Sequence, residues 1–427
     1  MPRDGETRIA DVGSLAGGTG APPRPAKVGY YPTKSRLITD YPSKMLFRVP
    51  ALTAQDREIV SRIDELKRAL SHAVTASPRR WIGSLRRVTF ARAVRGSNSI
   101  EGYNVEVDDA IAAAEGQEPL EVEEEAWAAV RGYQTAMTYV LQLADDPHFA
   151  YSAELLKALH FMMTQHKLDK NPGRWRRGPI FVRDDERDEI VYEGPDAAMV
   201  PSLVDELVAY LSAPAKVLDV PDLVKAAMAH LDLVMIHPFS DGNGRMARCL
   251  QTLVLARTGI LAAPFSSIEE YLGRNTRAYY DVLAQVGSGR WHPERDAHPW
   301  IRFCLTAHYR QAATLLLRTR EIHRLWDALE IEVQSRSLPE RTLYALSDAA
   351  QGLRVRNATY RPIAEISEAV ASRDLKSLVD QGLLVAKGEK RGRFYVASER
   401  LLAVRAATRE THAIEDPYGE PPGQGGS

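Results

Sequence analysis

The stretch from Pro221 to Gly259 limits most strongly what this chain can fold into. Two apolar helical segments flank a short polar loop, with proline in the first turn of one and glycine closing the other. The loop contains Gly242, Asn243 and Gly244, which permit a tight backbone with outward-facing amides at a helix N-terminus. Such N–H groups bind phosphate oxygens together with the helix dipole. The sequence therefore predicts an anion site between two helices.

Charged and titratable residues surround this loop. Arg245 and Arg248 lie three residues apart on one helical face, where two guanidinium groups suit several phosphates of one nucleotide. His237 and Asp241 bracket the loop. An imidazole there can take a proton from a hydroxyl group, and a carboxylate can hold Mg²⁺. Each residue alone is more often structural, but their combination within twelve residues favours a functional site.

The rest of the chain is also predicted to be mainly helical. Apolar residues at helical spacing over Ile59–Leu70 predict a helix that starts near Thr53. Further helices are expected over about 121–144 and from Ser152 onward. The exception is 178–193, where two short β-branched and aromatic runs flank a charged turn and predict a β-hairpin.

Composition excludes several classes of function. The 427 residues predict about three domains at roughly 150 residues each. A net charge of −1 gives no whole-chain attraction to nucleic acid or to membrane surfaces, so any charged function is local. Cys249 and Cys304 are too few for a disulfide framework, and a reducing, cytoplasmic location is expected. No apolar stretch reaches the length of a membrane span, so no membrane partner is expected.

The loop and its flanks resemble a known family. The residues from His237 to Arg248, HPFSDGNGRMAR, match every fixed position of the Fic family motif H-x-F-x-[D/E]-G-N-G-R-x-x-R. The resemblance covers about residues 40–310. The hairpin at 178–193 resembles the family's flap over the target segment, and NTRAYYDVLAQV resembles a helix of the nucleotide pocket. The resemblance implies a mainly α Fic helical fold with a β-hairpin flap.

The resemblance also implies an activity, since Fic enzymes usually move AMP from ATP to a Ser, Thr or Tyr hydroxyl. It implies a protein adenylyltransferase that uses ATP and Mg²⁺, releases pyrophosphate and acts on a protein target, with itself as a further candidate. By resemblance, His237 is the base that deprotonates the target hydroxyl, and Asp241 binds Mg²⁺. The implied nucleotide-binding residues are Gly242, Asn243, Gly244, Arg245, Arg248, Tyr279 and Tyr280.

A second motif lies upstream. Ser97–Gly102 reads S-x-x-x-E-G and matches the [S/T]-x-x-x-E-[G/N] inhibitory motif of Fic proteins whose inhibitory helix precedes the core. A carboxylate from Glu101 that pairs with Arg248 would compete with the γ-phosphate of ATP. Ser97 and Glu101 are therefore expected to be inhibitory, and the resting enzyme weakly active. A helix end at Gly102 is compatible with this interpretation.

The C-terminal part changes character. Residues 336–405 resemble a winged helix-turn-helix, with helix, turn, helix and two strands joined by a basic wing. Over Leu353–Tyr395 there are nine Lys and Arg residues against five Asp and Glu, which favours a DNA contact only modestly. Docking of a protein or of a second copy of the chain, as in a homodimer, fits equally well. The candidates for DNA contact are Arg373, Lys390, Arg391 and Arg393.

The sequence predicts six segments in total. They are a disordered tail (1–29), an N-terminal helical segment with the inhibitory motif (30–115), the Fic catalytic core (116–312), a connecting helix (313–335), the winged helix-turn-helix (336–405) and a second disordered tail (406–427).

Three other functions remain open at this stage. One is a DNA-binding regulator whose Fic domain senses a nucleotide, although a sensor has no need of His237. Another is a de-AMPylase, in which Glu101 positions water. The third is transfer of a different phosphate-containing group.

Overall fold

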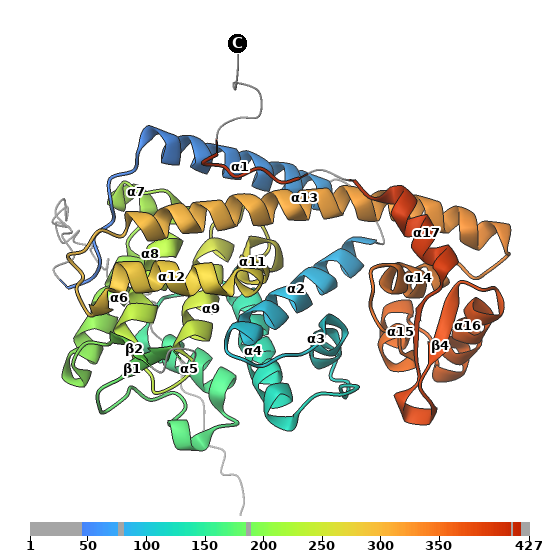
Figure 1. Ribbon diagram of the computed structural model, residues 1–427, viewed down its shortest axis with the longest axis horizontal. Coiled ribbons are helices and arrows are strands. Elements are labelled where there is room, and N and C mark those ends of the chain that lie inside the picture. Colours follow the sequence, from blue (N-terminus) through green and yellow to red (C-terminus); the bar gives the residue numbers. More distant parts are fainter. Residues whose placement is uncertain (1–44, 76–80, 185–188, 411–412, 420–427) are drawn as a thin grey trace, which may run out of the picture. The chain divides into compact units, whose positions relative to one another are not determined.

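The computed structural model describes residues 45–75, 81–184, 189–410 and 413–419. The expected tail at 1–29 lies outside the described residues. Helices dominate, which confirms the predicted fold class (Figure 1). The first five helices are α1 (Ala54–Thr75), α2 (Trp81–Ile100), α3 (Val107–Ala114), α4 (Glu124–Leu143) and α5 (Ala153–Thr164).

The middle of the chain adds a small sheet and seven more helices. The strands are β1 (Phe181–Asp184), β2 (Glu189–Glu193) and β3 (Gly289–Arg290). The helices are α6 (Val200–Ser212), α7 (Ala215–Leu218), α8 (Asp222–Ile236), α9 (Asn243–Ala256), α10 (Ala263–Ser266), α11 (Glu269–Arg274) and α12 (Thr276–Gly287).

The remaining elements follow one long helix, α13 (His298–Ser335), which packs beside α1 (Figure 1). They are α14 (Thr342–Ala350), α15 (Asn357–Ala364), α16 (Glu368–Asp380), β4 (Leu384–Lys387), β5 (Phe394–Ala397) and α17 (Glu399–Thr408). We call the part from α14 to β5 the C-terminal module. In it β4 pairs antiparallel with β5, and the winged helix-turn-helix stays a prediction for this segment.

Local side-chain bonds explain where the predicted helices begin. At the start of α1, the Thr53 backbone N–H and hydroxyl donate to Asp56 Oδ2 at 2.8 and 2.7 Å. Ser152 caps α5, because its Oγ accepts from the Leu155 N–H at 3.1 Å. These caps satisfy donors that a helix N-terminus otherwise leaves without a partner. Both helices therefore start where the sequence predicted.

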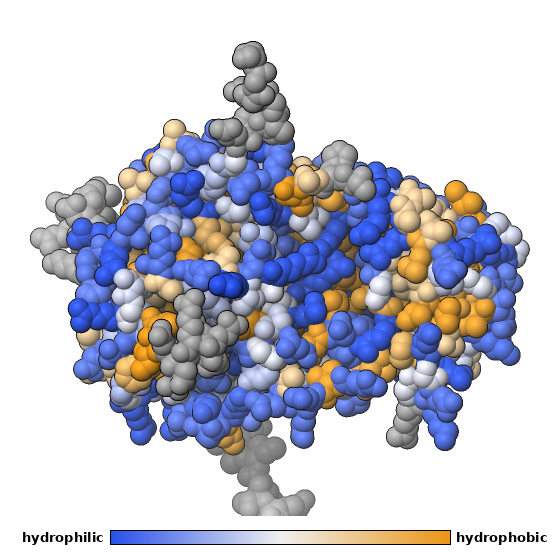
Figure 2. All heavy atoms as spheres, in the orientation of Figure 1, coloured by the Kyte–Doolittle hydropathy of each residue, from blue (hydrophilic) through white to orange (hydrophobic). Residues whose placement is uncertain are grey.

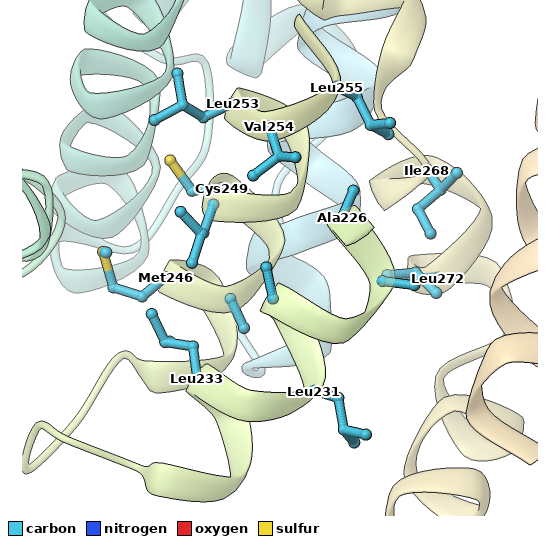
Figure 3. Close-up of a cluster of buried hydrophobic side chains, with 14 of the residues drawn as sticks. Ala226, Leu231, Leu233, Met246, Cys249, Leu253, Val254, Leu255, Ile268 and Leu272 are labelled. Atoms are coloured by element: carbon cyan, nitrogen blue, oxygen red, sulfur yellow. The ribbon is translucent and has the colours of Figure 1, made fainter. Parts of the chain in front are cut away.

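The two helices around the polar loop form the centre of the core. Almost every residue of α8 and α9 is buried. Figure 3 shows Leu233 from α8 and Met246 from α9 close to the loop, with Leu253 further along α9. Each large apolar side chain buried in this way contributes about 1.5–3 kcal/mol to stability. The loop between α8 and α9 is thus anchored at both ends in the core.

The predicted hairpin is present and has one more partner than expected. β1 pairs antiparallel with β2, and β2 pairs in parallel with β3 through Tyr192–Gly289 and Glu193–Arg290. The strand order β1-β2-β3 leaves β1 at an edge. A two-residue strand has no hydropathy pattern of its own, which is why β3 could not be predicted.

Two segment boundaries differ from the expectation. The boundary at 312/313 falls inside α13, so the core and the connecting helix share one continuous helix. The segment 406–427, expected to be a disordered tail, begins within α17, and part of it packs on the core. The Tyr418 hydroxyl donates to Asp56 Oδ1 at 2.7 Å, and Arg302 lies over the Tyr418 ring at 4.2 Å.

The surface in view is mostly hydrophilic. Figure 2 shows apolar side chains gathered in patches over the elements of the C-terminal module. No helix in the described ranges is both long enough and apolar enough to cross a membrane.

Two glycines fix the position of α2 against α11. A Cβ on Gly96 would lie 2.4 Å from the Glu269 carbonyl oxygen, and a Cβ on Gly273 would lie 2.7 Å from the Gly96 Cα. The two helix backbones therefore touch. We expect Gly96→Ala to lower the free energy of unfolding by about 1–3 kcal/mol, because the backbone must shift to make room. Chemical denaturation measures this change.

Gly83 is the matched control in the same helix, since nothing lies within 4 Å of a Cβ there. Gly83→Ala should leave stability unchanged or raise it slightly, because alanine favours the helix. Equal effects of the two substitutions would contradict the close contact at Gly96.

Candidate functional site

The loop between α8 and α9 has a tightly fixed backbone. His237 ends α8 with φ of 50°, and Gly242 precedes α9 with φ of 76°. The Asn243 side chain closes the loop: its Oδ1 accepts from the Phe239 N–H and its Nδ2 donates to the Phe239 carbonyl, both at 2.9 Å. The sequence placed Asn243 in an anion hole. Its side-chain amide is bonded to the Phe239 backbone, and its backbone N–H lies in the first turn of α9, where it suits that role.

His160 on α5 stabilises the loop between α8 and α9. Its ring stacks on Phe239 with centroids 3.7 Å apart. Gly173 N–H donates to its Nδ1 at 2.9 Å, so its Nε2 carries the proton and donates to the Asp241 carbonyl at 2.9 Å. Burial lowers the pKa of His160 to about 4, so the ring is neutral at pH 7. No sequence pattern marks this residue, because Asp241 lies 81 positions away.

Arg176 is a second supporting residue that the sequence did not reveal. It is 5% exposed and donates to four carbonyl groups, those of His237 and Gly178 at 2.8 Å each, that of Pro195, and that of Ile236 at 3.5 Å. Gly178 and Pro195 flank the hairpin, so one guanidinium group joins the hairpin to the loop.

The His237 imidazole has one nitrogen available for chemistry. Nδ1 lies 2.9 Å from the Val234 carbonyl oxygen, which can only accept, so Nδ1 carries the proton. Nε2 therefore presents a lone pair. Burial lowers the pKa of His237, which favours the neutral ring that a general base requires.

The two arginines of the loop have unsatisfied donors. Arg245 and Arg248 are 0% and 1% exposed. Among the described residues, no partner is present for Nε and Nη1 of Arg245 or for Nη1 of Arg248. A buried donor without a partner costs about 1–3 kcal/mol, more when it is charged. The arrangement therefore favours an anionic ligand at this position.

Arg248 binds both residues of the upstream motif. Its Nε donates to Ser97 Oγ at 2.8 Å, and its Nη2 donates to the Ser97 carbonyl at 3.0 Å and to Glu101 Oε1 at 2.6 Å. A Cβ on Gly244 would lie 2.5 Å from Glu101 Oε1. The Glu101 carboxylate thus lies against the N-terminal turn of α9, where the sequence predicted phosphate oxygens to bind.

The two predicted nucleotide-binding tyrosines occupy different environments. Tyr280 is 43% exposed, and its hydroxyl donates to the Ile100 carbonyl at 3.2 Å, next to the inhibitory motif. Tyr279 is only 1% exposed, its hydroxyl bonds His230 Nε2 at 2.9 Å, and its ring centre is 6.0 Å from the Arg248 guanidinium. Tyr279 thus lies beside Arg248 in the interior, and direct nucleotide contact stays a prediction for both tyrosines.

Asp241 is the candidate metal ligand. Its Oδ1 accepts from the Gly242 N–H at 2.7 Å, and its Oδ2 is 3.8 Å from Arg245 Nη2. Its side chain is 28% exposed. In the described ranges, no group of three or more His, Cys, Asp or Glu side chains could hold a metal ion. One accessible carboxylate fits Mg²⁺, which proteins usually bind with one or two carboxylates plus substrate phosphates.

The predicted DNA-contacting residues belong to the C-terminal module and not to this site. Arg373 on α16 is exposed, as are Lys390 and Arg393 before β5. The side chain of Arg391 lies outside the described part of the structure.

Comparison with known proteins shows what the chain is similar to. Residues 150–255, which include α8, the loop and the first 13 residues of α9, match the Fic/DOC family model. The chain contains a Fic domain. It is 28% identical over 265 residues to a protein adenylyltransferase Fic of Nematostella vectensis, covering 60% of this chain and 55% of that protein. It is 30% identical over 194 residues to that of Culex quinquefasciatus, covering 45% and 35%.

Solved structures share the fold of this chain. A Fic family protein from Desulfovibrio desulfuricans matches 82% of the chain and 98% of its own length, with 21% identity and a TM-score of 0.52. A Fic-domain-containing signaling protein from Bacteroides thetaiotaomicron matches 62% and 97%, with 17% identity and a TM-score of 0.51. The predicted resemblance to the Fic family is thus confirmed, while the present chain spans about half or less of those two curated relatives.

The support that His160 gives the loop is testable. His160→Phe keeps a flat ring against Phe239 but leaves the Gly173 N–H and the Asp241 carbonyl without their partner. We expect the free energy of unfolding to fall by about 1–3 kcal/mol, measured by chemical denaturation. His166→Phe is the control, because the ring nitrogens of His166 have no partner among the described residues. If His166→Phe lowered the free energy of unfolding and His160→Phe did not, the role assigned to His160 would be wrong.

Proposed function

We propose that this chain is a protein adenylyltransferase that Glu101 holds in an inhibited state. The observation that carries the proposal is the environment of Arg248. Its buried guanidinium group has one donor without a partner and holds the Glu101 carboxylate at 2.6 Å, at the start of the helix that follows the Fic loop. The names of the curated relatives support AMP transfer as the reaction.

The catalytic step follows from the His237 tautomer. The lone pair on Nε2 takes the proton of a target Ser, Thr or Tyr hydroxyl, and the resulting oxygen attacks the α-phosphorus of ATP. The bond from that phosphorus to the bridging oxygen breaks, and pyrophosphate leaves with its electron pair. His237 afterwards returns its proton to solvent. The lowered pKa of His237 keeps the base neutral at pH 7.

Phosphate binding uses the loop and both arginines. The backbone N–H groups at the start of α9 face an anion, and the helix dipole favours negative charge there. The free donors of Arg245 and Arg248 add charged hydrogen bonds. Asp241 would hold Mg²⁺, which supplies neutralisation of phosphate charge when it is bound.

The hairpin is suited to present the target. β1 is an edge strand, so its outer edge can pair with an extended segment of another protein. Phe181 and Ile190 on the hairpin are 48% and 57% exposed, which gives such a segment an apolar surface to contact. Arg176 joins this hairpin to His237, so a target strand on β1 lies in fixed relation to the base.

Inhibition follows from competition for Arg248. Glu101 Oε1 occupies the space beside Gly244 and takes a donor that a phosphate would otherwise use. ATP must then bind without that contact, in a pose less suited to in-line attack. Loss of the carboxylate should therefore raise activity.

The direct test is intact-mass spectrometry of the Glu101→Gly protein incubated with Mg²⁺ and ATP, with pyrophosphate release followed in parallel. We expect a mass gain of one AMP and a rate at least about tenfold above that of the unchanged protein, since a hydrogen bond to a charged group contributes about 1.5–3 kcal/mol. No AMP incorporation and no pyrophosphate would contradict the proposed function.

Two control variants sharpen this test. Glu106→Gly changes an exposed glutamate at the N-cap of α3, whose side chain makes no capping bond, and should behave like the unchanged protein. Adding His237→Ala to Glu101→Gly should lower the rate at least about a hundredfold, because the base is lost, while ATP still binds. An undiminished rate in the double variant would rule out His237 as the base.

A further inference from the structure

Glu101, the proposed inhibitory residue, lies between α2 and α3, and both helices contact the C-terminal module. Glu101 follows the end of α2, and α3 begins at Val107, six residues later. Both helices bind side chains of the C-terminal module through charged groups that are largely buried. No part of the Fic motif takes part in these contacts.

The first contact is between α2 and α14. Asp348, which is 7% exposed, accepts from Ser84 Oγ at 3.2 Å and from Arg87 Nη2. Arg87 also donates from Nη1 to Glu115 Oε1 at 3.0 Å, directly after α3. Arg87 thus joins α2, the end of α3 and the C-terminal module.

The second contact is between α3 and the segment that connects α14 with α15. Arg354 donates from Nε to Asp108 Oδ2 at 2.6 Å and from Nη2 to Asp109 Oδ2 at 2.7 Å. These carboxylates are 7% and 1% exposed. Arg356 adds a bond from Nη1 to the Glu118 carbonyl at 2.6 Å. Removing one partner of such a buried ion pair is strongly destabilising, because the remaining charge is left uncompensated.

The turn that carries Glu101 is tied to both helices. Arg95 on α2 donates from Nε to the Val105 carbonyl at 2.8 Å, and the Tyr103 N–H donates to the Asn98 carbonyl at 3.0 Å. A shift of α3 therefore also moves the turn that carries Glu101. The backbone of α2 is in close contact with α11 at Gly96, which limits movement of the whole helix. The C-terminal module therefore affects the position of the turn and not that of α2 as a whole.

We propose that the C-terminal module positions Glu101 on Arg248, with Arg354 and Asp348 as the positioning residues. The inference rests on the proposed function, since it assigns the module control over the strength of the same inhibition. While the ion pairs hold, the turn keeps the carboxylate against Gly244. When they open, Glu101 leaves Arg248 more often, and ATP gains the freed donor. A ligand of the module that draws Arg354 away from α3 has the same effect.

The test is the rate of AMP incorporation by full-length Arg354→Met in the presence of Mg²⁺ and ATP. We expect a rate at least about fivefold above that of the unchanged protein, the lower end of typical coupling between sites, and no higher than that of Glu101→Gly. In the double variant Arg354→Met/Glu101→Gly, the first change should add nothing. Asp109→Asn, which alters the other side of the same pair, should reproduce the gain.

Arg341→Met is the matched control. It removes an arginine directly before α14 that binds Asp374 on α16 at 2.7 and 2.9 Å, and these bonds involve neither α2 nor α3. It should leave the rate at that of the unchanged protein. An equal gain in Arg341→Met would overturn the proposal, because general loosening of the module would then explain the effect.

Hydrogen–deuterium exchange over residues 98–105 tests the positioning without any activity. We expect faster exchange there in Arg354→Met than in Arg341→Met. If Glu101→Gly transfers AMP but Arg354→Met matches the unchanged protein, the positioning role is wrong. If Glu101→Gly transfers none, the proposed function fails, and unchanged exchange in Arg354→Met would then overturn the positioning role separately.

Discussion

The hydrogen bond between Arg248 and Glu101 is the interaction on which this account depends. A guanidinium group that is 1% exposed needs compensation for the water it has lost, and Ser97 and Glu101 supply it in this structure. A phosphate group offers the same compensation with more negative charge. In the proposed mechanism, the γ-phosphate of ATP and the Glu101 carboxylate therefore compete for one buried cation at the N-terminal turn of α9.

The fold holds Arg248 and the proposed base, His237, in fixed positions. α8 and α9 are buried along most of their length, so the loop between them cannot shift as a whole. His237 ends α8 in a left-handed conformation uncommon for a residue with a side chain, which the surroundings must hold in place. His160 and Arg176 do so through bonds to the Asp241 and His237 carbonyls.

The parts that could be predicted are those determined within a few residues of sequence. The helices around the loop, the caps at Thr53 and Ser152 and the hairpin follow from periodicity and local hydrogen bonding, and the Fic motif lies within twelve residues. The parts that could not be predicted depend on distant partners. His160 meets Asp241 across 81 positions, and Arg354 meets Asp108 across 246. Single-sequence patterns carry no information on such pairs.

The affinity of ATP relative to ADP tests the central claim most directly, because the two ligands differ only in the γ-phosphate that competes with Glu101. Isothermal titration would compare both nucleotides with Mg²⁺ on the unchanged protein, on Glu101→Gly and on Glu101→Gly/Arg248→Met. We predict nearly equal affinities for the unchanged protein, a preference for ATP of about tenfold or more in Glu101→Gly, and loss of that preference when Arg248 is also replaced. The same ATP-to-ADP ratio in all three proteins would contradict the claim that the carboxylate and the γ-phosphate share Arg248.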